Sequence, residues 1–313
     1  MERRKLGQLE VSVVGLGTNS FGTTFATPVD SAGTRAVVHA ALDAGINFID
    51  TADIYGDSED FIGQALEGRR HQAVLATKFG GQVGPDPTSK GASARWIVQA
   101  VEGSLRRLRT DHIDLYQLHF PDPESPLEET LTALDQLVTA GKVLEIGCSN
   151  FSGELIDTAA TICEGRGLRP FASAQNDLSV LRSKTLDDVV PACARHGMGV
   201  IPFGPLASGL LTGKYRRGEQ PAPDTRLGHS TPERLERTLT ERTFDRLERL
   251  NTFATQHGHS LLELAFGWLL AIPQVVSVIA GATRPEQAHA NVNAASWVLT
   301  QEEFEEAAQL ARG

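Results

Sequence analysis

The stretch Phe48-Ile49-Asp50-Thr51-Ala52-Asp53-Ile54-Tyr55-Gly56 decides how the rest of the chain is interpreted. Its apolar start, together with Ile46 and the preceding Gly45, is too short for a helix and predicts a buried strand. Asp50 then stands where the strand ends, and Tyr55 lies in the loop that follows. A carboxylate and a phenol at a strand exit suit proton transfer. On these residues alone, a capping aspartate and an interface tyrosine are an equally acceptable interpretation.

Two later apolar runs end in the same way. The run 73–77 leads directly into Lys78, and the run 113–118 leads into His119. Segments of helical character separate these strands along the chain. Three successive strands are therefore expected to deliver a titratable group each at the C-terminal end.

Strand and helix alternate along the whole chain. After an N-terminal β-hairpin over residues 3–14, the sequence predicts buried strands at 13–18, 46–49, 73–77, 113–118, 143–147, 171–174, 198–203 and 275–280. Helices are expected at 34–43, 58–66, 94–107, 127–139, 153–163, 186–195, 233–257, 261–271 and 285–294, and an extra C-terminal helix at 302–311. This alternation predicts parallel βα units closed into a (β/α)8 TIM barrel, with the chemistry at the C-terminal strand ends. We expect residues 1–313 to form a single domain.

Composition excludes several classes of protein. The formal net charge of −10 argues against a nucleic-acid or anionic-membrane partner. The basic run 106–109 is expected on a solvated helix face. The three cysteines show no paired spacing, so neither a disulfide framework nor a metal site is indicated. With no signal peptide and no apolar run of about 18 residues, we expect a cytoplasmic protein without a membrane segment.

The three strand ends together resemble the catalytic tetrad of the aldo-keto reductases. The likeness lies in NFIDTADIYG (47–56), LATKFG (75–80) and DLYQLHFPDP (114–123), and it extends from Val14 to Asn291. It implies a TIM-barrel oxidoreductase that reduces aldehydes and ketones to alcohols by hydride transfer from NADPH. The catalytic residues that it implies are Asp50, Tyr55, Lys78 and His119.

In this interpretation Tyr55 donates a proton to the carbonyl oxygen. Because a free tyrosine is a poor acid at pH 7, we expect a nearby ammonium, Lys78, to lower its pKa. Asp50 would keep Lys78 charged and oriented, and a neutral His119 would hydrogen-bond the same oxygen. The alternative for Lys78 and Asp50 is a structural salt bridge whose desolvation costs more than the pairing returns.

The resemblance also predicts where a nicotinamide cofactor binds, and each contact follows a late strand. Polar groups after the fifth and sixth strands look like those that hold the carboxamide, and an aromatic after the seventh looks like the one that stacks on the ring. The loop 205–215 is similar to the family's pyrophosphate loop, and the segment 281–291 resembles its adenosine-phosphate segment. The predicted contacts are Ser149, Asn150, Gln175, Phe203, Pro205, Leu206, Ser208, Gly209, Lys214, Gly281, Thr283, Arg284, Gln287 and Asn291.

Cofactor preference and substrate class are less sharply indicated. Gly281 and Gln287 occupy places where some family members carry basic residues, so Arg284 is the candidate for the 2′-phosphate. We favour NADPH and leave NADH open. Phe21 and Phe120 are the candidate substrate contacts and favour apolar or aromatic aldehydes.

Other interpretations stay open at this point. Glycines 15 and 17 suggest a Rossmann fingerprint, but its third glycine is missing. A cofactor-binding regulatory or redox-sensing subunit, like the similar potassium-channel β subunits, would show little turnover. A barrel enzyme that only transfers protons would bind no nicotinamide. Asp53 and His112 are expected at the surface. The sequence leaves open the physiological carbonyl substrate, the direction of the reaction in the cell and the oligomeric state.

Overall fold

The computed structural model describes residues 1–22 and 28–312. Its centre is an eight-stranded parallel sheet with the neighbour order β10-β3-β4-β5-β6-β7-β8-β9. Parallel bridges between Val200 and Val275 and between Phe203 and Ile279 join the two ends of this order, so the sheet closes. The predicted TIM barrel is confirmed. Its strands are β3 (Val14–Gly17), β4 (Phe48–Asp50), β5 (Val74–Phe79), β6 (Ile113–Leu118), β7 (Val143–Ser149), β8 (Ser173–Gln175), β9 (Gly199–Val200) and β10 (Val278–Gly281).

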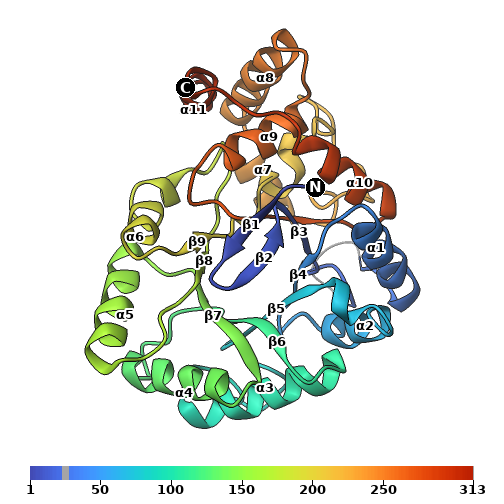
Figure 1. Ribbon diagram of the computed structural model, residues 1–313. Helices are drawn as coiled ribbons and strands as arrows, with labels where there is room; N and C mark the ends of the chain where they lie inside the picture. Colours follow the sequence, from blue (N-terminus) through green and yellow to red (C-terminus); the bar gives the residue numbers. More distant parts are fainter. Residues whose placement is uncertain (23–27, 313) are drawn as a thin grey trace.

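Helices surround the barrel, and Figure 1 shows α1 to α6 following one another around it. They are α1 (Ser31–Asp43), α2 (Ser58–Ala65), α3 (Ala94–Leu108), α4 (Leu127–Thr139), α5 (Gly153–Arg166), α6 (Val189–Arg195), α7 (Pro232–Thr238), α8 (Glu241–Gln256), α9 (Leu261–Leu270), α10 (Pro285–Ala294) and α11 (Gln301–Arg312). Short 3-10 turns are η1 (Arg70–Gln72), η2 (Lys184–Leu186) and η3 (Ala207–Thr212). Within the described residues, no helix is both long and apolar enough to cross a bilayer.

One predicted helix is divided in the structure. The sequence suggested a single helix over 233–257, whereas α7 ends at Thr238 and α8 begins at Glu241. Leu239 leaves the helical conformation with ψ at 56°, and the hydroxyl of Thr240 accepts a hydrogen bond from the Thr243 N–H. A side-chain cap of this kind starts a new helix without interrupting the apolar periodicity that predicted one.

The N-terminal hairpin seals one end of the barrel. Strands β1 (Arg3–Leu6) and β2 (Leu9–Ser12) pair antiparallel, and the turn between them lies against the start of β7. There the N–H of Gln8 donates to a carboxylate oxygen of Glu145 at 2.8 Å. Figure 1 shows the hairpin across the centre of the helix ring. Because it covers the N-terminal strand ends, the C-terminal ends remain as the approach to the interior.

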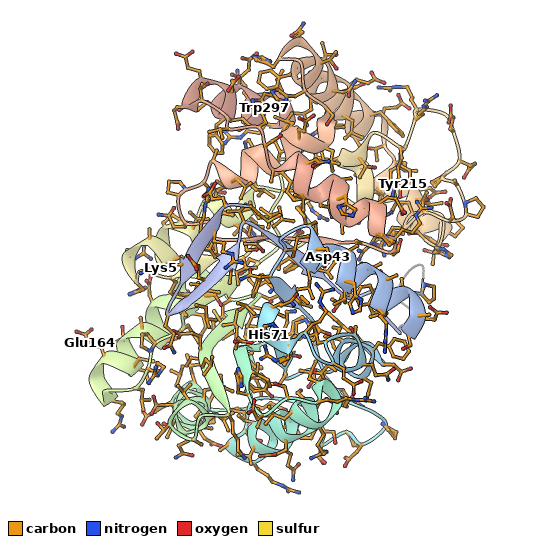
Figure 2. The ribbon with its side chains drawn as sticks, turned by 45° about the vertical axis from the view of Figure 1, so that its right-hand side comes forward. Lys5, Asp43, His71, Glu164, Tyr215 and Trp297 are labelled. Carbon is orange, nitrogen blue, oxygen red and sulfur yellow. The ribbon has the colours of Figure 1, made fainter. Side chains whose placement is uncertain are left out.

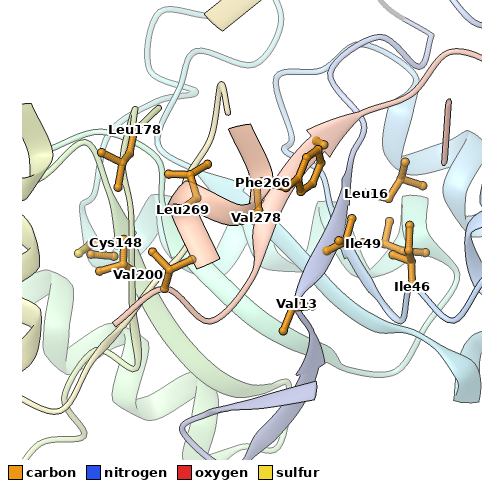
Figure 3. Close-up of a cluster of buried hydrophobic side chains, with 14 of the residues drawn as sticks. Val13, Leu16, Ile46, Ile49, Cys148, Leu178, Val200, Phe266, Leu269 and Val278 are labelled. Carbon is orange, nitrogen blue, oxygen red and sulfur yellow. The ribbon is translucent and has the colours of Figure 1, made fainter. Parts of the chain in front are cut away.

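Two apolar layers hold the barrel together. A small cluster inside it combines hairpin residues such as Leu6 and Leu9 with Phe48, Leu115 and others from the strands. A larger cluster fills the space between strands and helices; Figure 3 shows part of it, where side chains of α9 approach those of β3 and β10. Alternate residues of each strand thus face the inner and the outer cluster. Packing on both sides fixes the height of each inward side chain along the barrel axis and the direction in which it points.

Candidate active site

Asp50 and Lys78 form a buried ion pair at the C-terminal end of β4 and β5. The Lys78 ammonium lies 2.6 Å from Oδ2 of Asp50 and donates to the carbonyl oxygen of Thr51 at 2.8 Å. The side chain of Lys78 is 1% exposed and that of Asp50 is 4% exposed, so water screens this pair very little. Burial alone would lower the pKa of Lys78, but Asp50 and Tyr55 raise it, and the net pKa lies above its ordinary value. Lys78 is therefore charged.

Tyr55 and His119 complete the group on the side facing away from the hairpin. The Lys78 nitrogen is 5.3 Å from the centre of the Tyr55 ring, and the rings of Tyr55 and His119 meet edge to face at 5.8 Å. The turn that carries Tyr55 is tied to the strands, because the N–H of Asp53 donates to the carbonyl of Lys78. All members of the predicted tetrad therefore meet in one place.

The protonation states follow from burial. Burial raises the pKa of Tyr55 and outweighs the lowering by Lys78, so the net shift is upward. Lys78 does lower the pKa of Tyr55, as expected, but the loss of water around the phenol raises it by more. Burial, with a further contribution from Lys78, lowers the pKa of His119 to about 3. At neutral pH both Tyr55 and His119 are uncharged.

The predicted carboxamide contacts lie next to this group. Asn150, in the left-handed region with φ at 60°, donates from Nδ2 to the carbonyl of His119 at 2.9 Å and to the hydroxyl of Ser149 at 3.1 Å. Gln175 donates from Nε2 to Oδ1 of Asp50 at 2.8 Å. Gln175 therefore touches the Asp50 carboxylate, a contact that the sequence did not suggest.

The predicted pyrophosphate loop has an unusual backbone. Ala207, Ser208 and Gly209 follow one another with positive φ values of 46°, 62° and 90°. The Lys214 ammonium folds back over this loop, only 3.0 Å from where a Cβ at position 209 would stand. Of the two residues that precede Ala207, Pro205 is buried and Leu206 is half-buried. Figure 2 shows Tyr215, the next residue, well separated from Lys5 on the hairpin. Because the loop follows the C-terminal end of β9, it belongs to the open end of the barrel.

The remaining predicted cofactor residues lie just after β9, at the end of β10, and before and within α10. Half-buried Phe203 bridges to Asp177 and Ile279 at the barrel rim. Gly281 pairs with Gly17, the neighbour of Asp50 in the sheet. Thr283 and Arg284 precede α10, and Gln287 and Asn291 lie within it. Gln287 accepts hydrogen bonds from the N–H and the hydroxyl of Thr283. Arg284 is exposed and Asn291 is buried.

The two predicted substrate contacts differ sharply in exposure. Phe120 is 44% exposed and stacks on His119, with 4.3 Å between ring centres and 6° between ring planes. Phe21 is fully buried in the outer apolar cluster. Phe120 offers an apolar face at the site, whereas Phe21 packs within the core.

Several residues near the site escaped the sequence analysis. Asp53, expected at the surface, is 5% exposed, since the turn folds it behind β5 toward Glu59. Arg107, expected on a solvated face, pairs with the buried Glu59 at 2.7 Å. Arg226, from the irregular loop before α7, lies near enough for its charge to lower the pKa of Tyr55. No motif marks Arg226, so only the folded loop reveals it.

Taken with the relatives described next, the barrel and a buried Lys–Asp pair beside a tyrosine and a neutral histidine identify a nicotinamide-dependent oxidoreductase. The sequence model of the Aldo/keto reductase family matches residues 13–312. The chain is 34% identical over 300 residues to the aldo-keto reductase YhdN of Bacillus subtilis, covering 94% of this chain and 88% of the relative. This protein therefore belongs to the aldo/keto reductase family, and its reaction is the reduction of small carbonyl compounds.

Two further relatives show how widely the family's roles vary. A probable voltage-gated potassium channel subunit beta from Oryza sativa is 34% identical over 303 residues, with 94% of this chain and 91% of the relative covered. An L-glyceraldehyde 3-phosphate reductase from Escherichia coli is 33% identical over 270 residues, covering 83% and 78%. Family membership thus fixes the type of chemistry and leaves the substrate to be determined.

Proposed function

We propose that this protein reduces aldehydes or ketones with NADPH, and that Tyr55 donates the proton. The observation that carries the proposal is the convergence of Tyr55, His119 and the Lys78–Asp50 pair at the open end of the barrel. When bound, the nicotinamide supplies a hydride to the carbonyl carbon. The oxygen, which becomes negative as the hydride arrives, then needs a proton, and the product is an alcohol.

The chain supplies that proton and stabilises the oxygen. Tyr55 holds its proton at neutral pH because burial raises its pKa, so it is in the form that a donor requires. Lys78 places a positive charge beside Tyr55 and favours the phenolate left behind. The neutral His119 orients the oxygen by a hydrogen bond without competing for the proton.

The loop at the open end of the barrel supports a binding site there for the cofactor's phosphates. Three successive residues with positive φ, Ala207 to Gly209, are small enough for a phosphate to approach the backbone. Lys214 and Arg226 add positive charge on the same loop. Arg284, exposed at the N-cap of α10, is our candidate for the 2′-phosphate and the reason for favouring NADPH.

Phe120 supports a preference for apolar or aromatic carbonyls. Its exposed face stacks on His119, so a substrate held by His119 meets an aromatic surface. We propose Phe120 as a substrate contact. Phe21 is not retained in this role because it is fully buried.

The test is NADPH oxidation with 4-nitrobenzaldehyde. We expect turnover in the native protein and a fall of about 10²- to 10⁴-fold in Tyr55→Phe, with NADPH binding, followed by fluorescence, retained. Tyr116→Phe is the matched control, since its buried hydroxyl has no hydrogen-bond partner among the described residues. Full activity in Tyr55→Phe would refute the proton-donor role. Tight NADPH binding without turnover would instead favour a regulatory subunit.

Cofactor preference needs a separate measurement. Arg284→Ala should weaken NADPH binding about tenfold or more and leave NADH binding nearly unchanged, because only NADPH carries the extra phosphate. Equal losses for both cofactors would contradict the assignment of Arg284.

A further inference from the structure

Three side chains hold the catalytic carboxylate, and one of them has no role in the reaction described above. Lys78 contacts Oδ2 of Asp50, whereas Oδ1 accepts hydrogen bonds from two amides. Gln175 donates to Oδ1 at 2.8 Å, and Gln117 donates at 3.2 Å. Gln117 is fully buried and Gln175 is 2% exposed. Oδ2 of Asp50 is thereby held from β5, and Oδ1 is held from β6 and β8.

The strand pairing places Gln117 in the barrel interior, next to Lys78. Gln117 pairs with Lys78 across the β5–β6 ladder and stands two residues before His119, on the same inward face. On the other side it pairs with Gly147 of β7. A Cβ at position 147 would lie 3.2 Å from Cγ of Gln117, so the glycine leaves the space that this side chain uses.

Packing alone does not account for a glutamine at this position. Oε1 of Gln117 is buried and has no hydrogen-bond partner among the described residues. A buried polar atom without a partner is unfavourable, and an apolar side chain of the same length would avoid this cost. What the glutamine adds is an N–H directed at a charged carboxylate, which is among the stronger hydrogen bonds in proteins.

We propose that Gln117 is a positioning residue for carbonyl reduction: it fixes the Asp50 carboxylate so that Asp50 holds Lys78 beside Tyr55. The proposal rests on the proposed function, in which the Lys78 charge favours the tyrosinate left after proton transfer. Gln117 acts through Asp50, the residue to which its amide donates, and within the described part of the chain it makes no hydrogen bond to Tyr55. Gln175 contributes to the same carboxylate but is also a candidate cofactor contact, so Gln117 gives the cleaner test.

The test variant is Gln117→Met, which keeps the length of the side chain and removes the donor. We expect kcat to fall about tenfold or more, with KM for the aldehyde and NADPH binding nearly unchanged. The melting temperature should stay equal or rise, because the unpartnered Oε1 is removed. A residue that only supported the fold would show the opposite, a loss of stability that accompanies the loss of activity.

A double-mutant cycle tests whether Gln117 acts through Asp50. In an Asp50→Asn background, Gln117→Met should change kcat less than about twofold, because the carboxylate that it positions is gone. Ser173→Ala is the matched control, since Ser173 is a buried residue of β8 that faces the same interior and bonds no site residue through its hydroxyl. It should leave kcat unchanged in both backgrounds. Unaltered kcat in Gln117→Met, or equal effects in both backgrounds, would overturn the proposal.

A measurement without turnover separates this proposal from the proposed function. In protein labelled with ¹⁵N-glutamine, the side-chain amide signal of Gln117, assigned with Gln117→Met, should shift strongly in Asp50→Asn. If the native protein reduces no carbonyl, the proposed function fails and the role of Gln117 in it fails too, whatever this signal shows. If the native protein is active but the amide signal does not respond to Asp50→Asn, only the positioning role of Gln117 is refuted.

Discussion

The hydroxyl of Ser58 lies 2.9 Å from the hydroxyl of Thr51, behind the turn that carries Tyr55. Ser58 is fully buried, and its Oγ also lies within hydrogen-bond distance of the hydroxyl and the carbonyl of Thr18. Its backbone N–H donates to the carbonyl of Tyr55. One serine thus links the ends of β3 and β4 to the turn that carries Tyr55, while the carbonyl of Thr51 accepts from Lys78.

Removing this hydroxyl should loosen the turn. We expect Ser58→Ala to lower the free energy of unfolding by about 1–3 kcal/mol, because buried partners are left unpaired. It should also lower kcat while leaving NADPH binding intact. Urea unfolding and steady-state kinetics measure the two effects. Ser93→Ala, which removes the hydroxyl that caps α3 by accepting from the Trp96 N–H, is the control: it should cost about 1 kcal/mol of stability and leave kcat unchanged.

The Lys78–Asp50 pair should be strongly coupled in stability. Each residue is buried, so replacing one leaves the other without its ionic partner, and we expect Asp50→Asn or Lys78→Met to cost about 3–5 kcal/mol. The double variant should be less destabilised than the sum of the single variants, because no uncompensated charge remains. All three should lose most of the activity. Additive stability losses in urea unfolding would show that the pair is not coupled.

His119 should remain neutral throughout the working range of the enzyme. Its pKa is lowered to about 3 by burial and by Lys78, against about 6.5 for an ordinary histidine. Since the folded state disfavours the charged ring, stability should be lost as the pH falls from about 6.5 toward 3, with no such loss above that window. In ¹⁵N-histidine spectra, the signal that disappears in His119→Gln should not titrate between pH 5 and 8. A midpoint near 6.5 would contradict the burial argument.

How far the sequence could predict this site depends on the range of each interaction. The ends of β4, β5 and β6 were predictable because apolar runs and their terminal residues are local signals. Asp50, Lys78 and His119 followed from those ends, and the resemblance supplied the roles. The hydrogen bond from Gln117 to Asp50 was not predictable, because it joins residues 67 positions apart and depends on the relative register of β4 and β6 in the barrel.

The burial of individual side chains was the second property that the sequence did not predict. Asp53 looks like a loop residue in the sequence, yet the turn packs it inward, and the net shift in the pKa of Tyr55 depends on how much water the fold removes. Neither is encoded in a local pattern. The division of the helix over 233–257 is different, since Thr240 is a recognisable cap and the apolar period simply continued across it.

Asp53 itself should make the protein less stable as the pH rises. Both of its carboxylate oxygens are buried without a hydrogen-bond partner among the described residues. Burial, followed by the nearby Glu59, raises its pKa to about 8, well above the value of about 3.9 in an unfolded chain. Between these two values the folded state binds the extra proton, so the free energy of unfolding should fall by at most about 1.4 kcal/mol per pH unit.

Comparison with Asp53→Asn isolates this contribution, because the other titrating groups are common to both proteins. An amide cannot ionise, so the variant should gain stability relative to the native protein by about 2–3 kcal/mol between pH 5 and 7. Urea unfolding at the two pH values measures the difference. If the stability difference between the two proteins were the same at pH 5 and pH 7, Asp53 would have to ionise as readily in the folded as in the unfolded chain. The turn behind Tyr55 would then have to admit water or a counter-charge to that carboxylate.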